Sequence, residues 1–222
     1  MSKKEKAKRY ILFVISLFFS ALGVAVTKHG ALGVSPTSSV ANVFSIKFVS
    51  ISLGTWLILW NCILIIGQII ILRKDFKMIQ LLQIPLSFLF GYFIDFGMWC
   101  VSSITINSYI VQMLFVVTGV IILGFGVALS VIANVIMNSG EAFIKAISDK
   151  SGKNFGNIKI GFDICNVILS LILSIILFNG AIIGIREGTV IAAVFTGIVV
   201  KFFIKVLNAP LQKMLSVKSV CV

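Results

Sequence analysis

The sequence predicts an all-α integral membrane protein with six transmembrane helices, arranged as two inverted three-helix repeats. Of its 222 residues, 59% are hydrophobic and only 12% are charged, with a mean hydropathy of +1.13. Soluble domains carry about twice that charged fraction. Several apolar runs are almost free of charge over roughly 20 residues, the length that spans a bilayer. Short motifs also recur at a nearly constant offset, which predicts the repeats.

Six apolar segments are long enough to span the membrane. Their expected ranges are about 10–28, 52–72, 79–102, 109–132, 158–178 and 188–207. The first segment resembles a signal peptide in its basic start. We interpret it as a true span, because its apolar part is long and no A-x-A cleavage site follows it.

The basic residues predict the orientation. Sixteen of the 19 lysines and arginines lie in the tails, in the connections after the second and fourth spans, or near the inner end of a span. Only Lys28, Lys47 and Arg186 lie on the other side. By the positive-inside rule, both termini are expected to be cytoplasmic. The expected location is the bacterial cytoplasmic (inner) membrane.

Three pairs of motifs predict a duplication. "GVAV" at 23–26 returns as "GVAL" at 126–129, "SLGTW" at 52–56 pairs with "NFGNI" at 154–158, and "FLFGYFIDF" at 88–96 pairs with "VFTGIVVKF" at 194–202. Three spans in each half would place the halves in opposite orientations. We therefore expect a single membrane domain over 1–222, with repeats at about 10–102 and 109–207 and cytoplasmic tails at 1–9 and 208–222. Inverted repeats are typical of secondary transporters.

The duplication also relates two irregular stretches, "TKHGALGVSPTSSVANVFS" and "SVIANVIMNSGEAFIKAIS". In the first, Ser35 and Pro36 predict the start of a short helix. In the second, Asn138 is the expected cap, and Glu141 has the capping-box spacing. Both helices are too short to span, so each is either re-entrant or interfacial. A helix N-terminus favours anions, and two such ends pointing inward would form an anion-binding centre.

These two stretches supply the candidate substrate-binding residues, which are Lys28, His29, Gly33, Ser35, Pro36, Asn134, Asn138, Ser139 and Glu141. Structural explanations stay open for several of them. Lys28 and His29 suit the C-terminal end of a helix dipole. Glu141 and the two asparagines suit caps and broken backbone.

Three further residues are candidates for coupling or gating: Asp95, Asp163 and Thr189. A carboxylate inside a span is costly unless it faces protein, water or a cation. Asp95 instead suits an outer interface, and Asp163 suits a local ion pair with Lys159 four residues earlier.

The stretches "SLGTW", "GYFID" and "GTVIAAVFTGIVVKF" carry a family resemblance. With "GALGVSP" after the first span, the chain resembles the bacterial YczE/YyaS/YitT group of multi-pass membrane proteins, and most of all its YczE-like branch. The resemblance covers nearly the whole chain. It implies the fold and the membrane location more than an activity.

We expect a small secondary transporter or exporter of a small, anionic solute, with its site between the repeats. Enzyme motifs such as HExxH and the P-loop are missing, so an enzyme is not expected. The cysteines form no C-x-x-C pair, and we expect no metal and no cofactor. The expected partners are the lipid bilayer and the solute, with no nucleic acid; a homo-oligomer or membrane partner protein stays open. Two alternatives remain: a non-transporting membrane partner or regulatory protein, and a substrate-binding subunit of a vitamin-type transporter.

Overall fold

The computed structural model describes residues 3–106 and 108–215. This part of the chain is helical and contains no β-strand, as the sequence predicts. The α-helices are α1 (Lys3–His29), α2 (Pro36–Lys47), α3 (Leu53–Leu72), α4 (Gln83–Val101), α5 (Tyr109–Ala133), α6 (Ser139–Ser151), α7 (Phe155–Leu177) and α8 (Glu187–Leu215). Two 3₁₀ helices, η1 (Arg73–Asp75) and η2 (Met78–Leu82), connect α3 to α4. Six helical stretches are long and apolar enough to cross a membrane, and they match the six predicted spans.

The first and last long helices extend beyond the predicted spans. Arg9 forms an ion pair with Glu5 one turn earlier, at 3.2 Å. Arg9 also donates to the carbonyl of Ala133 at the end of α5 (3.2 Å) and to Gln212 Oε1 in α8 (2.9 Å). The expected tails are therefore helical over 3–9 and 208–215, where they bind the C-terminal end of α5. The remainder of both tails lies outside the described residues.

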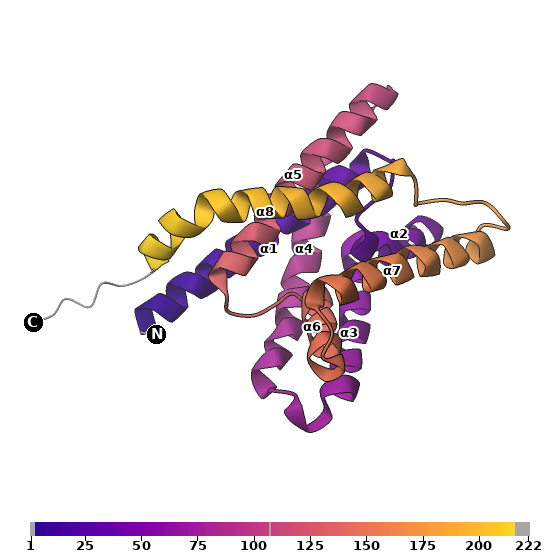
Figure 1. The fold of residues 1–222 in the computed structure, drawn as a ribbon. Helices are drawn as coiled ribbons and strands as arrows, with labels where there is room; N and C mark the ends of the chain where they lie inside the picture. The colour runs from indigo at the N-terminus through magenta and orange to yellow at the C-terminus, as the bar shows by residue number, and fades with distance from the viewer. Residues whose placement is uncertain (1–2, 107, 216–222) are drawn as a thin grey trace, which may run out of the picture.

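The two predicted short helices are present as α2 and α6. Pro36 occupies the first turn of α2, where its missing N–H costs no hydrogen bond. Asn138 caps α6 by accepting a hydrogen bond from Ser139 N at 2.8 Å. Each short helix packs against both α3 and α7, so the two lie among the long helices (Figure 1).

The centre of the molecule is the contact between α1 and α5. Gly23 lies against the backbone of Leu123, and a Cβ added to it would come within 2.6 Å of Leu123 Cα. Gly126 lies against α1, where a Cβ would come within 2.9 Å of Ser16 O. Small residues let membrane helices approach closely. The single glycine of each "GVA" motif therefore lies in the same helix crossing, one on each helix.

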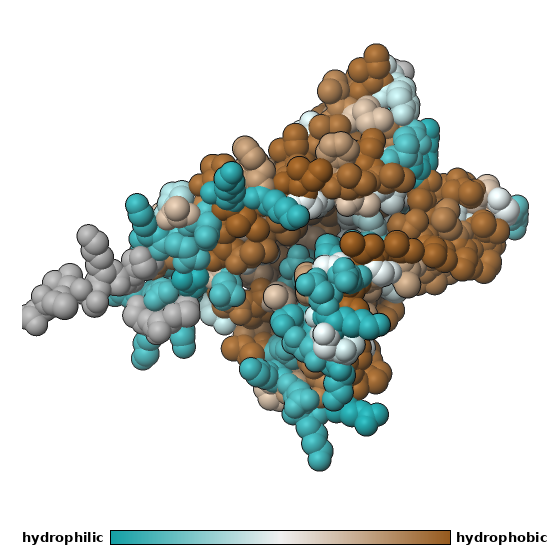
Figure 2. All heavy atoms as spheres, in the orientation of Figure 1, coloured by the Kyte–Doolittle hydropathy of each residue, from teal (hydrophilic) through white to brown (hydrophobic). Residues whose placement is uncertain are grey.

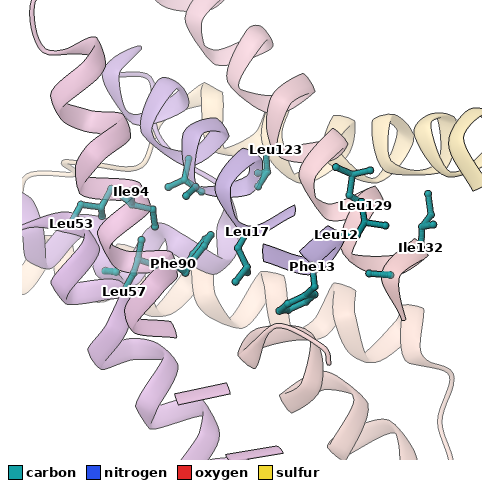
Figure 3. Packing of buried hydrophobic residues seen from close by; sticks show 14 of the residues in the cluster. Leu12, Phe13, Leu17, Leu53, Leu57, Phe90, Ile94, Leu123, Leu129 and Ile132 are labelled. Carbon is teal, nitrogen blue, oxygen red and sulfur yellow. The ribbon is translucent and has the colours of Figure 1, made fainter. Parts of the chain in front are cut away.

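The largest buried hydrophobic cluster surrounds α1. It includes Phe13 and Leu17 of α1, together with Phe90 of α4 and Leu129 of α5. Figure 3 shows these side chains between α1, α4 and α5, with those of α3 alongside. This cluster holds α1 against both of its long neighbours.

The closest packing of one half recurs in the other, with one main exception. α1 packs against α4 as α5 packs against α8; α2 packs against α3 as α6 packs against α7; α2 contacts α7 as α6 contacts α3. The exception is the pair α3–α4, which packs closely, whereas α7 and α8 have no comparable contact in the described part of the chain. α7 and α8 run apart from the connection at 178–186 (Figure 1).

Hydrophilic residues gather over the chain ends, over α6 and over the α3–α4 connection, whereas hydrophobic residues cover most of the rest of the visible face (Figure 2). These hydrophilic regions include the basic residues Lys74, Lys77, Lys145 and Lys150. The surface pattern is that of a protein whose apolar belt faces lipid.

Candidate functional site

The candidate site begins where α1 ends. α1 ends at His29, and Ala31 and Gly33 then adopt positive φ angles of 58° and 112°. A side chain at Gly33 would overlap Thr189 Oγ1 of α8, so glycine meets both the backbone and the space requirement. Gly188 N donates to Leu32 O at 2.8 Å. The irregular stretch 30–35 is therefore held against the start of α8.

Lys28 turns its ammonium group toward α2. Its Nζ donates to Asn42 Oδ1 at 2.6 Å and to Ser45 Oγ at 2.7 Å. Asn42 in turn donates to the carbonyl of Gly184 at 2.8 Å. These contacts join the end of α1, the short helix α2 and the connection that precedes α8.

An open pocket of about 470 Å³ lies among these three elements. Lys28, Asn42 and Arg186 supply polar side chains to its lining. The rest of the lining comes from residues 31, 33 and 34, from Ile46, and from residues 182–184. Small-molecule sites are concave, mostly apolar and carry a few convergent polar groups, and this pocket has that composition.

The start of α6, in the second half, adjoins a closed space. The side-chain amides of Gln68 and Gln83 hydrogen-bond to each other at 3.1 and 3.2 Å, and Gln68 Nε2 also donates to Ser139 O at 3.1 Å. Ser87 Oγ lies 3.1 Å from Ser139 Oγ. The space beside these groups is about 10 Å³, enough for roughly one water molecule.

Of the first group of predicted residues, Lys28 and Gly33 line the open pocket. His29 does not: its Nε2 lies 2.7 Å from Ile104 O, and its ring packs against Phe115. Ser35 makes no side-chain cap to α2, because its hydroxyl donates to Ser38 Oγ at 3.1 Å.

Of the second group, Asn138 and Ser139 line the closed space. Asn134 ends α5 in the left-handed conformation (φ 48°) and is exposed. Glu141 lies in the first turn of α6, where burial raises the pKa of its carboxyl group and the charge of Lys159 partly opposes that shift. The nine predicted residues are therefore divided between two regions.

Asp95 caps a neighbouring helix. Its Oδ1 accepts from Gly54 N at 2.9 Å, and its Oδ2 accepts from Ser52 Oγ at 2.6 Å. The carboxylate of α4 thus binds the free N–H groups at the start of α3, where the helix dipole favours negative charge. The "SLGTW" and "GYFID" motifs meet at this contact.

Asp163 pairs with Lys159 on α7, at 3.1 Å between Oδ2 and Nζ. Its second oxygen, Oδ1, is buried without a hydrogen-bond partner. Thr189 is also buried, and its Oγ1 lacks a partner close to Gly33. Of the three coupling candidates, only Thr189 lies beside the open pocket.

The sequence did not indicate two residues of the open pocket, Asn42 and Arg186, or Ser45, which binds Lys28 beside it. Asn42 and Ser45 lie on α2 one turn apart, and their only signal was that they are polar residues in a short apolar helix. Arg186 stands in the "GIREGT" insertion before α8. No local pattern relates it to Lys28.

No group of three or more His, Cys, Asp or Glu side chains that would hold a metal ion occurs within residues 3–106 and 108–215. The chemistry available at the pocket is hydrogen bonding and positive charge.

Comparison with known proteins gives relatives of no stated activity. A family model described as "Family of unknown function (DUF6198)" matches residues 7–205. The chain is 26% identical over 203 residues to the "Uncharacterized membrane protein YczE" of Bacillus subtilis (strain 168), covering 90% of this chain and 87% of that protein. It is 27% identical over 122 residues to the "Uncharacterized protein YyaS" of the same organism, covering 54% of this chain and 59% of that protein.

No solved structure matches the chain. The two relatives bear out the predicted resemblance to YczE and YyaS. Six apolar helices together with a membrane-protein relative identify a multi-pass membrane protein.

Proposed function

The chain belongs to the family of unknown function DUF6198, and we propose that it is a secondary transporter or exporter of a small solute. The observation that carries this proposal is the difference between the pocket beside α2 and the space beside α6. The second half of α2 and the stretch before this helix adjoin an open pocket of about 470 Å³, whereas the start of α6 adjoins a closed space of about 10 Å³. Alternating access requires one side of a carrier to be open while the other is closed.

The packing pattern supports an inverted repeat. Each half has the order long helix, short helix, long helix, long helix. Exchanging the halves converts the contacts of α1–α4, α2–α3 and α2–α7 into those of α5–α8, α6–α7 and α6–α3. Three spans per half place the second half in the opposite orientation. The exception, α7–α8, adjoins the open pocket, because the connection that joins these two helices lines it.

The burial of α2 supports a re-entrant position. From Leu32 to Val43, only Thr37 is not fully buried, whereas the end of α2 at Lys47 is exposed. A helix lying flat on the membrane surface would expose one face along its whole length. The N-terminus of α2 instead lies inside the protein, and Ser39 Oγ reaches the backbone of Asn166 on α7 at 3.4 Å.

We place both termini in the cytoplasm, because most basic residues lie with them. The open pocket then faces outward, since Lys28 lies at the far end of α1. The Gln68–Gln83 pair closes the inner side. Transport would require these two amides to separate while the outer pocket narrows between α2 and α8.

The function is tested by uptake into proteoliposomes. The labelled solutes are acetate, lactate, benzoate, phosphate and alanine, each offered with and without a proton or sodium gradient. At least one solute should enter faster than into protein-free liposomes. A thiol cross-linker should stop this uptake in a Gln68→Cys, Gln83→Cys variant whose native cysteines are replaced by serine. The matched control is the single Gln68→Cys variant, which should remain active.

Uptake that equals the protein-free level for every solute and gradient would argue against transport. Uptake that persists in the cross-linked pair would instead argue against the inner closure.

One observation favours a second candidate, a non-transporting membrane partner protein. Gly161 of α7 and Gly197 of α8 both have open space where a Cβ would lie. Glycine on an exposed helix face suits close packing against another helix. Purification of one partner protein in a fixed ratio, with no uptake of any solute, would favour this candidate.

A further inference from the structure

The ammonium group of Lys28 has no counter-charge in the described part of the chain. The ion pairs there join Arg9–Glu5, Lys145–Asp149, Lys159–Asp163 and Arg186–Glu187. Lys28 is half-buried, and its two hydrogen bonds go to the neutral side chains of Asn42 and Ser45. An ammonium group has three N–H donors, so one donor remains. A cation withdrawn from water is costly unless an anion pairs with it.

Arg186 brings a second positive charge to the same pocket. Its Nη2 lies 3.0 Å from Glu187 Oε1, and both side chains are exposed. A guanidinium group has five N–H donors, and a single contact leaves most of them free. Lys28 and Arg186 therefore contribute two positive charges against the one negative charge of Glu187.

The remaining wall of the pocket is apolar. Ile46 comes from α2, and Ile182 and Ile183 come from the connection before α8. Ile182 and Ile183 are 57% and 37% exposed. A purely inorganic ion would leave these isoleucines without a partner, whereas an organic anion would cover them.

We propose that this pocket binds an organic anion, whose charged group lies between Lys28 and Arg186 and whose apolar part covers Ile46, Ile182 and Ile183. The inference rests on the proposed transport function, because it names the substrate class of the same site. The required chemistry is a carboxylate or phosphate group on an apolar body. It has two sources, a free organic acid or an anionic lipid of the outer leaflet.

The test uses the full chain in phosphatidylcholine nanodiscs and measures the binding of benzoate by saturation-transfer NMR. Benzamide, which has the same shape without the charge, is the ligand control. The variants are Lys28→Met and Arg186→Gln, which remove one charge each, and the matched control is Lys205→Met on the exposed face of α8. A second set of nanodiscs contains phosphatidylglycerol.

We expect benzoate to bind and benzamide not to bind. Lys28→Met should weaken benzoate binding at least tenfold, Arg186→Gln should weaken it severalfold, and Lys205→Met should leave it unchanged. If phosphatidylglycerol competes with benzoate, the natural ligand is a lipid; if it does not, the ligand is a free acid. Both results support the anion site.

The proposal is overturned if benzoate does not bind, if benzamide binds equally well, or if benzoate binding is the same in Lys28→Met as in the wild type. Should Lys28→Met fail to fold, Arg186→Gln decides alone, because its side chain is exposed. Benzoate binding without uptake of any solute would reject transport and keep the anion site. Uptake at the wild-type rate in both the Lys28→Met and the Arg186→Gln variants would support transport and reject the anion site.

Discussion

At the scale of single residues, the polar side chains inside this protein serve different purposes. Asp95 binds the start of another helix through Ser52 and Gly54. Lys28 binds only neutral partners beside an open pocket. Both are charged residues near the end of a span, and the sequence left a structural and a functional role open for each. Their partners decide that Asp95 is structural and that Lys28 is available to a ligand.

Replacing Asp95 by alanine should destabilise the protein by about 1–2 kcal/mol, because helix caps contribute energies of that order. The reason is that Gly54 N and Ser52 Oγ both lose their acceptor. The measurement is thermal unfolding in detergent. Asp149→Ala removes a carboxylate from an exposed pair on α6 and should cost less than about 0.5 kcal/mol. Equal effects of the two changes would contradict the capping role.

Glu141 should make stability depend on pH. Burial raises the pKa of its carboxyl group in the folded state, so the folded protein favours the protonated form. The stability from this group is fully present below its unfolded pKa of about 4.5 and is lost as the pH rises through the folded pKa. Glu141→Gln should flatten this part of the unfolding profile between acidic and neutral pH. An Asp149→Asn control should keep the wild-type slope, and a slope retained in Glu141→Gln would refute the assignment.

At the scale of elements, the duplicated motif places one glycine on each side of the α1–α5 crossing. Gly23 faces the backbone of α5, and Gly126 faces the backbone of α1. An added Cβ would overlap a backbone nitrogen in each case, Leu123 N for Gly23 and Ser20 N for Gly126, so the helices would have to separate to admit a methyl group.

Gly126→Ala should therefore destabilise the protein by about 1–3 kcal/mol, as overpacked cores do. Gly161→Ala is the matched control, because nothing lies within 4 Å of the position its Cβ would take. Alanine is the better helix former by roughly 0.5–1 kcal/mol, so the control should be neutral or stabilising. The two changes should thus shift the unfolding temperature in opposite directions, and a shift in the same direction would count against the close crossing.

At the scale of the whole molecule, the two halves pack alike except at α7 and α8. The open pocket lies beside that exception, and the glutamine pair closes the other half. Gln68 and Gln83 have long amides that reach each other. On the motif offsets of 102 and 106, the corresponding residues in the second half are Ser170 and Thr189. These are shorter, and Thr189 Oγ1 finds no partner. The shorter side chains of Ser170 and Thr189 therefore explain part of the difference between the closed space and the open pocket.

The orientation of the whole molecule is tested by labelling introduced cysteines in intact cells with a membrane-impermeant maleimide. On a background without native cysteines, Val49→Cys and Ala181→Cys should react directly. Both positions are exposed, and they lie in the α2–α3 and α7–α8 connections. Lys74→Cys and Lys150→Cys should react only after the membrane is permeabilised. Labelling of one half from the wrong side would exclude the inverted arrangement.

The sequence by itself determined the six spans and the two short helices, with Pro36 in the first turn of one and Asn138 as the cap of the other. These features depend on length, hydropathy and local capping, which act within one helix or turn. It also indicated Lys28 and Gly33, because charge and glycine are unusual beside an apolar run, and it indicated Thr189 through the stretch "GTVIAAVFTGIVVKF" that carries the family resemblance.

Only the tertiary structure decided that Lys28, Asn42 and Arg186 line one pocket, that Gln68 and Gln83 close another, and that Asp95 caps α3. Each of these contacts joins different helices or the connections between them. Chain spacing does not specify such contacts, because they follow from how the helices pack. The stretch around Gly33 shows the division: its sequence required a turn, and the packing of α8 against it made that turn one wall of the open pocket.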